Sequence, residues 1–155
     1  MSTTSHAPLA GRRALVTGGS RGIGAATVRR LAADGAAVAF TYQSSPDAAQ
    51  DLVDELEANG AKVAAIKADS ADALAVAAAV DEAVERLGGL DILVNNAGVA
   101  QGAPIESFPL EDFDRMLDIN VKAVFAAIQR AVPHLGAGGR IITIGSVNAD
   151  RVPTV

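Results

Sequence analysis

The stretch Ala14-Leu15-Val16-Thr17-Gly18-Gly19-Ser20-Arg21-Gly22-Ile23-Gly24 decides the fold of this chain. A short apolar run leads directly into a glycine-rich turn, and the helix-forming residues 25–33 follow at once. This order places backbone N–H groups and a helix N-terminus where a pyrophosphate can bind. Glycine suits the turn because it accepts positive φ angles and because a Cβ would hold a phosphate away. The turn predicts a nucleotide site with the candidate ligands Gly18, Ser20, Arg21, Gly22, Ile23 and Gly24.

Beyond this turn, short apolar runs alternate with helical patterns along the whole chain. The predicted strands are residues 13–17, 37–42, 62–68, 91–95 and 140–144, and the predicted helices are residues 22–34, 46–59, 71–87 and 110–135. Short continuous apolar runs are typical of strands buried on both faces of a parallel sheet. The pattern predicts an α/β fold, a Rossmann-like doubly wound parallel sheet with strand order 3-2-1-4-5. A ligand would lie over the carboxyl ends of its strands, between strands 1 and 4.

Length and composition exclude several classes of protein. The 155 residues predict one domain, which we place at residues 11–155 behind a flexible lead of residues 1–10. Hydrophobic residues make up 50% of the chain, and its formal net charge of −5 argues against nucleic-acid binding. Cysteine, a signal-peptide pattern and an apolar stretch of membrane-spanning length are all absent from the sequence. We therefore expect a cytoplasmic protein that neither enters a membrane nor holds a metal.

The glycine-rich turn has two other interpretations. It could be a tight strand–helix connection with no ligand, although the order of strand, turn and helix favours a nucleotide site. Residues 19–24 also have the glycine spacing of a P-loop. However, Ala25 and Ala26 stand where a P-loop carries lysine and a hydroxyl residue, so phosphoryl transfer is not expected.

The end of the second predicted strand, Tyr42-Gln43-Ser44-Ser45, indicates which dinucleotide would bind. An NAD site usually has a carboxylate here, about 20 residues after the glycines, to bind the ribose hydroxyls. This chain has no acidic residue until Asp47. Because Arg21, Ser44 and Ser45 could bind a 2′-phosphate, NADP(H) is favoured over NAD(H), with Tyr42 also at the site. The two serines could equally cap the following helix.

The fourth predicted strand ends in Asn95-Asn96-Ala97-Gly98. Two adjacent amides at a strand end can tie neighbouring strands together, and Ala97 and Gly98 would let a cofactor approach closely, although the tetrapeptide alone could be an amide-rich turn. Together with the Gly-x3-Gly-x-Gly spacing, this motif makes the chain from about Gly11 onward resemble the short-chain dehydrogenase/reductase family. Within that family it looks most like the 3-oxoacyl-[acyl-carrier-protein] reductase-like members. The resemblance implies hydride transfer between a nicotinamide cofactor and a small carbonyl or alcohol substrate.

The resemblance also implies roles for four further residues. Asp69 matches an aspartate that contacts adenine, with Ser70 beside it, although either residue could simply cap the next helix. Asn120 matches a helix asparagine that helps to hold a proton-relay water, and Ser146 matches a serine that binds the substrate oxygen. Without the resemblance, Asn120 would be interpreted as a partly buried structural polar residue and Ser146 as a turn residue at a strand end.

The catalytic Tyr-x-x-x-Lys pair of the family is absent from this sequence, whose single tyrosine is Tyr42. We therefore expect a C-terminally truncated member that lacks the later strands and helices of the family and is inactive as written. The alternative is a non-catalytic nucleotide-binding or regulatory module. The long predicted helix from Leu110 to Leu135 is apolar over more than one face, which predicts a homo-oligomer formed through it.

Overall fold

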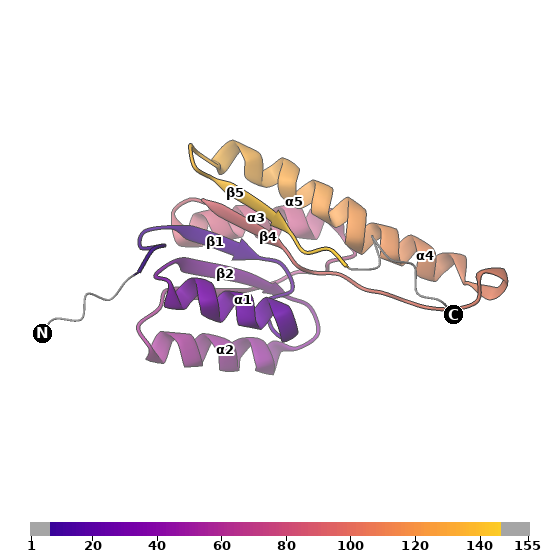
Figure 1. Ribbon diagram of the computed structural model, residues 1–155, viewed down its shortest axis with the longest axis horizontal. Coiled ribbons are helices and arrows are strands. Elements are labelled where there is room, and N and C mark those ends of the chain that lie inside the picture. The colour runs from indigo at the N-terminus through magenta and orange to yellow at the C-terminus, as the bar shows by residue number, and fades with distance from the viewer. Residues whose placement is uncertain (1–6, 147–155) are drawn as a thin grey trace, which may run out of the picture.

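The computed structural model describes residues 7–146, which form a parallel sheet with helices on both faces (Figure 1). The strands are β1 (Arg13–Val16), β2 (Ala37–Tyr42), β3 (Val63–Lys67), β4 (Ile92–Asn95) and β5 (Arg140–Thr143). The α-helices are α1 (Gly22–Ala33), α2 (Pro46–Ala58), α3 (Ala73–Leu87), α4 (Leu110–Leu117) and α5 (Ala123–Ala131). Shorter helical segments are η1 (Ile105–Ser107), η2 (Asp118–Lys122) and η3 (Val132–His134). The predicted strands and the first three helices are confirmed, with ends that differ by one or two residues.

The strands lie in the order β3-β2-β1-β4-β5, and every neighbouring pair is parallel, which confirms the predicted topology. β1 is central: its Leu15 stands opposite Ala39 of β2 and Leu93 of β4. The chain leaves β1 toward β2 on one side and returns through β4 on the other. The carboxyl end of β1 is therefore the point where the two halves of the sheet diverge, and a ligand crevice forms at such a point.

Two hydrophobic clusters cover the two faces of the sheet. On one face Val16 and Phe40 pack with buried residues of α1 and α2, among them Val28 and Leu52. On the other face Leu15 packs with buried residues of α3 and α5. Consecutive residues of β1 thus contribute to opposite clusters, because side chains alternate between the faces of a strand. Figure 1 shows the same division, with α1 and α2 on one side and α3 and α5 on the other.

The long helix predicted from Leu110 to Leu135 is continuous, but it changes its winding twice. The π-helical segment η2 separates α4 from α5, and the final turn η3 is a 3₁₀ helix that contains Pro133. A π segment widens the helix by one residue, and such segments are frequent at functional sites. The side chain of Asn120 projects from this segment. Figure 1 shows that α4 extends beyond the carboxyl ends of the strands.

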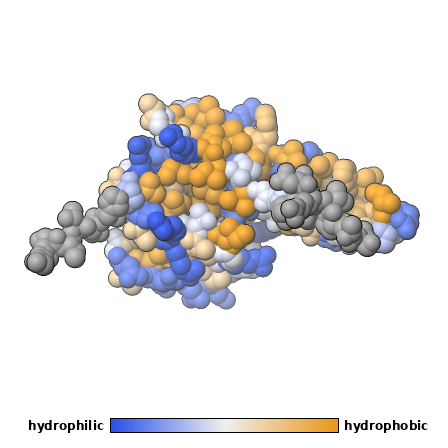
Figure 2. All heavy atoms as spheres, viewed as in Figure 1, coloured by the Kyte–Doolittle hydropathy of each residue, from blue (hydrophilic) through white to orange (hydrophobic). Residues whose placement is uncertain are grey.

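β5 is less buried than the other four strands. All four of its residues are exposed, with Ile142 at 47% of its full accessibility. β5 pairs only with β4, so it is an edge strand of the described sheet. Figure 2 shows hydrophobic residues gathered over this part of the molecule.

The first described residues are tied to the domain rather than detached from it. The backbone N–H of Leu9 donates to the Asp34 carbonyl at 2.8 Å, and the Leu9 side chain packs against the cluster under α1. Residues 7–10 of the predicted lead are thus in contact with the domain, and residues 1–6 lie outside the described part of the chain. Within residues 7–146, no helix combines the length and the apolar character that crossing a membrane requires.

Candidate functional site

A cavity with a volume of about 410 Å³ lies over the carboxyl ends of the strands. Its walls come from the turn after β1, the ends of β2 and β3, the turn after β4, and α4 with η2. The lining residues are Gly18, Ser20, Arg21, Gly22, Ile23, Gly24, Tyr42, Gln43, Ser44, Ser45, Ser70, Asn96, Ala97, Gly98, Val99, Arg115 and Ile119. Thirteen of the sequence-predicted site residues are in this set, so the structure brings the glycine turn and the strand-four motif to one place.

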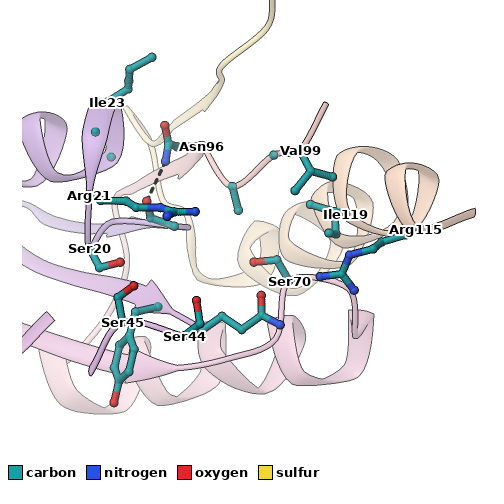
Figure 3. Close-up of a pocket in the computed structure, with 17 residues that line it drawn as sticks. Ser20, Arg21, Ile23, Ser44, Ser45, Ser70, Asn96, Val99, Arg115 and Ile119 are labelled. Carbon is teal, nitrogen blue, oxygen red and sulfur yellow. Dashed lines mark hydrogen bonds between the residues drawn. The ribbon is translucent and has the colours of Figure 1, made fainter. Parts of the chain in front are cut away.

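Hydrogen bonds from neighbouring strands hold the glycine turn in shape. The Gly18 N–H donates to the Thr41 hydroxyl at 2.9 Å. The Asn96 side-chain amide donates to the carbonyls of Thr17 and Gly18, both at 3.0 Å, and Figure 3 shows the second of these bonds. The Thr17 hydroxyl in turn accepts the backbone N–H groups of Asn96 and Ala97 at 3.0 Å. The turn after β1 and the turn after β4 are therefore fastened to each other.

Close packing also explains why Gly24 carries no side chain. A Cβ at Gly24 would overlap the Gly18 carbonyl oxygen and would lie 2.6 Å from Asn96 Nδ2. A side chain there would push α1 away from the turn that precedes it. The absence of a side chain at Gly24 thus sets the position of the N-terminus of α1 over the cavity.

The N-terminus of α1 has backbone N–H groups that no side chain caps. Arg21 occupies the N-cap position with no side-chain capping bond, and the first turn of α1 contains no acidic residue. The first N–H groups of a helix lack partners within the helix and carry partial positive charge, so they favour an anion. Because Gly22 and Ile23 also line the cavity, this end of it suits a phosphate.

The serines at the end of β2 also face the cavity rather than completing the next helix. Ser45 is the N-cap residue of α2, and Pro46 follows at the first helical position, but the Ser45 side chain makes no capping hydrogen bond. Ser44 and Ser45 both line the cavity, as Figure 3 shows. Capping therefore does not account for the two hydroxyl groups here. Helix α3, in contrast, has a side-chain cap. Its N-cap residue is Asp72, whose carboxylate accepts the N–H groups of Leu74 and Ala75, and not Asp69 or Ser70.

Asn120 is exposed, contrary to the expectation of partial burial, but both polar atoms of its side-chain amide are hydrogen-bonded. Its Oδ1 accepts the Val99 N–H at 3.0 Å, and its Nδ2 donates to the Val99 carbonyl at 2.8 Å. The amide thus holds the loop after β4 against η2. Asn120 itself does not line the cavity; it acts on the lining through Val99.

Two other predicted residues lie outside the cavity lining. The Asp69 carboxylate accepts the N–H of Ala71 at 2.8 Å, and the lining includes its neighbour Ser70 instead. Ser146 is an exposed residue three positions after the end of β5. Sequence reasoning in turn missed Val99, Arg115 and Ile119, and it named no role for Gln43. Arg115 and Ile119 lie four residues apart on the helix that carries Asn120, and that spacing was the available signal.

The charge of the lining fits a phosphorylated ligand. Two arginines, Arg21 and Arg115, line the cavity, and none of its lining residues is acidic. Gly22 has a φ of +55°, and a Cβ there would meet no protein atom within 4 Å, so the backbone is open to a ligand at this point. The fold is Rossmann-like, and the cavity lies at the point of the sheet where domains of this fold commonly bind nucleotides.

Comparison with known proteins gives the family. A family model described as short chain dehydrogenase matches residues 12–154. An uncharacterized oxidoreductase of Methylorubrum extorquens is 46% identical over 142 residues, which are 92% of this chain and 57% of that protein. A short-chain dehydrogenase from Burkholderia cenocepacia, solved in complex with NADP, superposes with a TM-score of 0.92 at 56% identity, covering 94% of this chain and 60% of that one. A blue fluorescent protein from a metagenomic library, solved with NADPH, superposes with a TM-score of 0.92 at 54% identity. The match covers 94% of this chain and 60% of that one.

The chain belongs to the short-chain dehydrogenase family. It spans 57% of the length of the Methylorubrum relative and 60% of the length of the Burkholderia structure.

Proposed function

We propose that the cavity binds NADP(H) and that the chain is the cofactor-binding part of an NADP(H)-dependent oxidoreductase acting on a carbonyl or alcohol. The observation that carries the proposal is the end of β2, where Ser44 and Ser45 face the cavity with Arg21 and no carboxylate. A carboxylate at this position would bind the ribose hydroxyls of NAD(H) and repel a 2′-phosphate. The NADP and NADPH complexes of the two solved relatives support the same choice of cofactor.

Each part of the cavity then has a task in holding the cofactor. The N-terminus of α1 and the turn from Gly18 to Gly24 hold the pyrophosphate. Arg21, Ser44 and Ser45 hold the 2′-phosphate, and Tyr42 flanks them. Ser70 bounds the adenosine end, whereas the turn from Asn96 to Gly98 lets the cofactor approach the end of β4. NADPH, when bound, supplies the hydride for reduction of a carbonyl.

For catalysis we propose two different roles for the predicted residues. Ser146 binds the substrate oxygen, whereas Asn120 is a positioning residue that fixes the loop beside the cavity through Val99. Neither a serine hydroxyl nor an amide gives up a proton readily near neutral pH. Loss of a positioned acid typically costs a factor of about 10²–10⁴ in rate. Because the 155 residues contain no Tyr-x-x-x-Lys pair, we expect this chain alone to bind cofactor without rapid turnover of 3-oxoacyl or related ketone substrates.

We further propose that copies of the chain associate through the long helix. Val121 and Phe125 are 56% and 65% exposed, and they line an open apolar groove of about 880 Å³ between α3 and α5. Exposed apolar areas of this kind mark contact surfaces in soluble proteins. A second copy would cover this surface with the same residues, as a two-fold contact requires.

Titration of the purified chain with NADPH and with NADH tests the cofactor proposal. We expect saturable binding of both cofactors, with NADPH bound more tightly. Equal affinities would contradict the choice of NADP(H), and failure of both to bind would contradict the proposed function. NADPH oxidation measured on the same sample with ketone substrates tests the expected inactivity, which turnover at a rate normal for an enzyme, about 1 s⁻¹ or faster, would refute.

A further inference from the structure

Two arginines stand apart from the others in the part of the chain that the structure describes. Within residues 7–146, the side chains of Arg21 and Arg115 make no hydrogen bond or ion pair, and both residues line the same cavity. The other described arginines each bond to a carboxylate or a carbonyl group: Arg12, Arg13, Arg29, Arg30, Arg86, Arg130 and Arg140. An arginine that faces a cavity without a partner retains five N–H donors and a flat cationic surface for a ligand.

A lack of acidic neighbours does not explain why the Arg115 side chain has no partner among the described residues. An exposed arginine on a helix commonly pairs with an acid three or four residues away, and Glu111, Asp112 and Asp118 stand at that spacing. Asp112 and Asp118 have other partners: Gln101 donates to Asp112 at 3.0 Å, and Lys122 donates to Asp118 at 2.6 Å. In Figure 3 the guanidinium of Arg115 extends from α4 toward the side of the cavity that Ser70 forms.

The surroundings of Arg115 suit a flat ring better than a phosphate. One helical turn further on, Ile119 lines the same wall and is 3% exposed. The hydroxyl groups that would bind a phosphate, Ser44 and Ser45, come instead from the loop after β2. A wall made of a buried aliphatic side chain and a planar cation is complementary to the face of a nucleobase, because guanidinium groups stack on such rings.

We infer that Arg115 determines cofactor affinity by packing its guanidinium plane on the adenine ring of the bound dinucleotide. The inference rests on the proposed function, since it assigns a residue to the adenine end of the same cavity. Arg21 then serves the 2′-phosphate, and the two unpaired arginines have separate targets on one ligand. Since NADPH and NADH carry the same adenine, Arg115 contributes equally to both, whereas Arg21 contributes mainly to NADPH.

Replacement of Arg115 tests this division. A contact between a cation and an aromatic ring is worth about a 2- to 30-fold change in binding, depending on how dry the contact is. Arg115→Ala should therefore lower the affinity for NADPH and the affinity for NADH by the same factor within this range. Arg115→Lys should recover only part of the loss, because lysine keeps the charge but not the flat surface. Arg21→Ala should lower the affinity for NADPH more than the affinity for NADH.

The experiment is a fluorescence titration of the 155-residue chain and its variants with both cofactors. Arg30→Ala is the matched control, because Arg30 is exposed on α1, pairs with Asp34 and lies outside the cavity. Circular dichroism verifies that each variant is folded, and a variant that unfolds is replaced by Arg115→Gln. Parental affinity in Arg115→Ala, full recovery in Arg115→Lys, or a loss confined to NADPH would each overturn the inference. If the parent chain binds neither cofactor, the proposed function fails as well, so the two failures are distinguishable.

Discussion

Replacing Gly22 by alanine should separate ligand binding from folding. Gly22 has a φ of +55°, a left-handed conformation that costs an alanine about 1–2 kcal/mol. A Cβ built there meets no protein atom within 4 Å, so the backbone strain is the main cost to the folded state. The methyl group would enter the open space at the start of α1, where we place the pyrophosphate. The substitution should therefore reduce affinity far more than stability.

The size of the expected effect follows from the contacts that the methyl group blocks. A hydrogen bond to a charged group contributes about 1.5–3 kcal/mol, so loss of one bond between a backbone N–H and a phosphate should weaken NADPH binding about 10- to 160-fold. Fluorescence titration gives the affinity, and urea unfolding of the same variant gives the stability. Binding of NADPH by Gly22→Ala with the parental affinity would refute the placement of the pyrophosphate.

Gly24→Ala is the matched comparison, because it should reduce the stability of the fold directly, whereas Gly22→Ala should mainly reduce cofactor affinity. Its Cβ would overlap the Gly18 carbonyl oxygen and would press on the Asn96 amide at 2.6 Å. These atoms belong to the hydrogen-bonded frame of the turn, so α1 must move to accept the methyl group. We expect Gly24→Ala to lose stability clearly in urea even without ligand, whereas Gly22→Ala should lose less stability. A larger stability loss for Gly22→Ala would contradict this account of the turn.

Three further substitutions test other parts of the molecule. Gln43→Asp should shift the preference from NADPH toward NADH by about fivefold or more, because like charges about 4 Å apart repel by roughly 1–4 kcal/mol. Titration with both cofactors measures the ratio of affinities, and an unchanged ratio would contradict the expectation. Asp91→Asn should lower stability by about 1.5–3 kcal/mol at pH 7, because Asp91 accepts bonds from the Arg13 guanidinium at 2.8 and 3.2 Å. The side-chain hydrogen bond from Arg13 lowers the pKa of Asp91 in the folded state. The contribution of Asp91 to stability is therefore complete above the unfolded-state pKa of about 3.9. It disappears as the pH falls through the lower pKa of the folded state. Urea unfolding should show the parent and the variant converging in strong acid, and a constant difference down to about pH 1 would be inconsistent with the linkage. Phe125→Asp should abolish self-association with little loss of stability, since Phe125 is 65% exposed; light scattering after gel filtration measures the mass, and a monomeric parent chain would disprove the proposed contact.

The fold was predictable because its signals are local and repeat along the chain. Each buried strand is a short apolar run, and glycine or proline marks the neighbouring turns, so the topology follows from the order of elements and the handedness of their connections. The exposure of β5 was predictable from its place at the end of the strand order, but not from its own apolar residues. An apolar run predicts that a strand is covered, but coverage depends on which elements pack beside it, and the described sheet ends at β5.

The cavity was predictable only where its residues belong to continuous motifs. The glycine turn and the residues from Asn96 to Gly98 were found because both follow directly from strands. Thr41, whose hydroxyl accepts the Gly18 N–H, is an ordinary residue in an apolar strand and gave no signal by itself. Arg115 escaped notice for a different reason: its importance lies in the ion pair that it does not make, which is visible only once its neighbours have been placed.

The arrangement of the cavity explains why cofactor binding and turnover can be separated in this chain. Among residues 7–146, those that line the cavity run from Gly18 to Ile119 in the sequence, ahead of β5. The bonds that stiffen it, from Asn96 to the turn after β1 and from Asn120 to Val99, fall within or next to that interval. Ser146, the candidate contact for the substrate oxygen, lies beyond it and outside the lining. Substitutions at Gly22 or Arg115 should accordingly reduce cofactor affinity, whereas Ser146→Ala should leave NADPH affinity unchanged. A loss of NADPH binding in Ser146→Ala comparable to that in Gly22→Ala would show that the two functions share one structural unit after all.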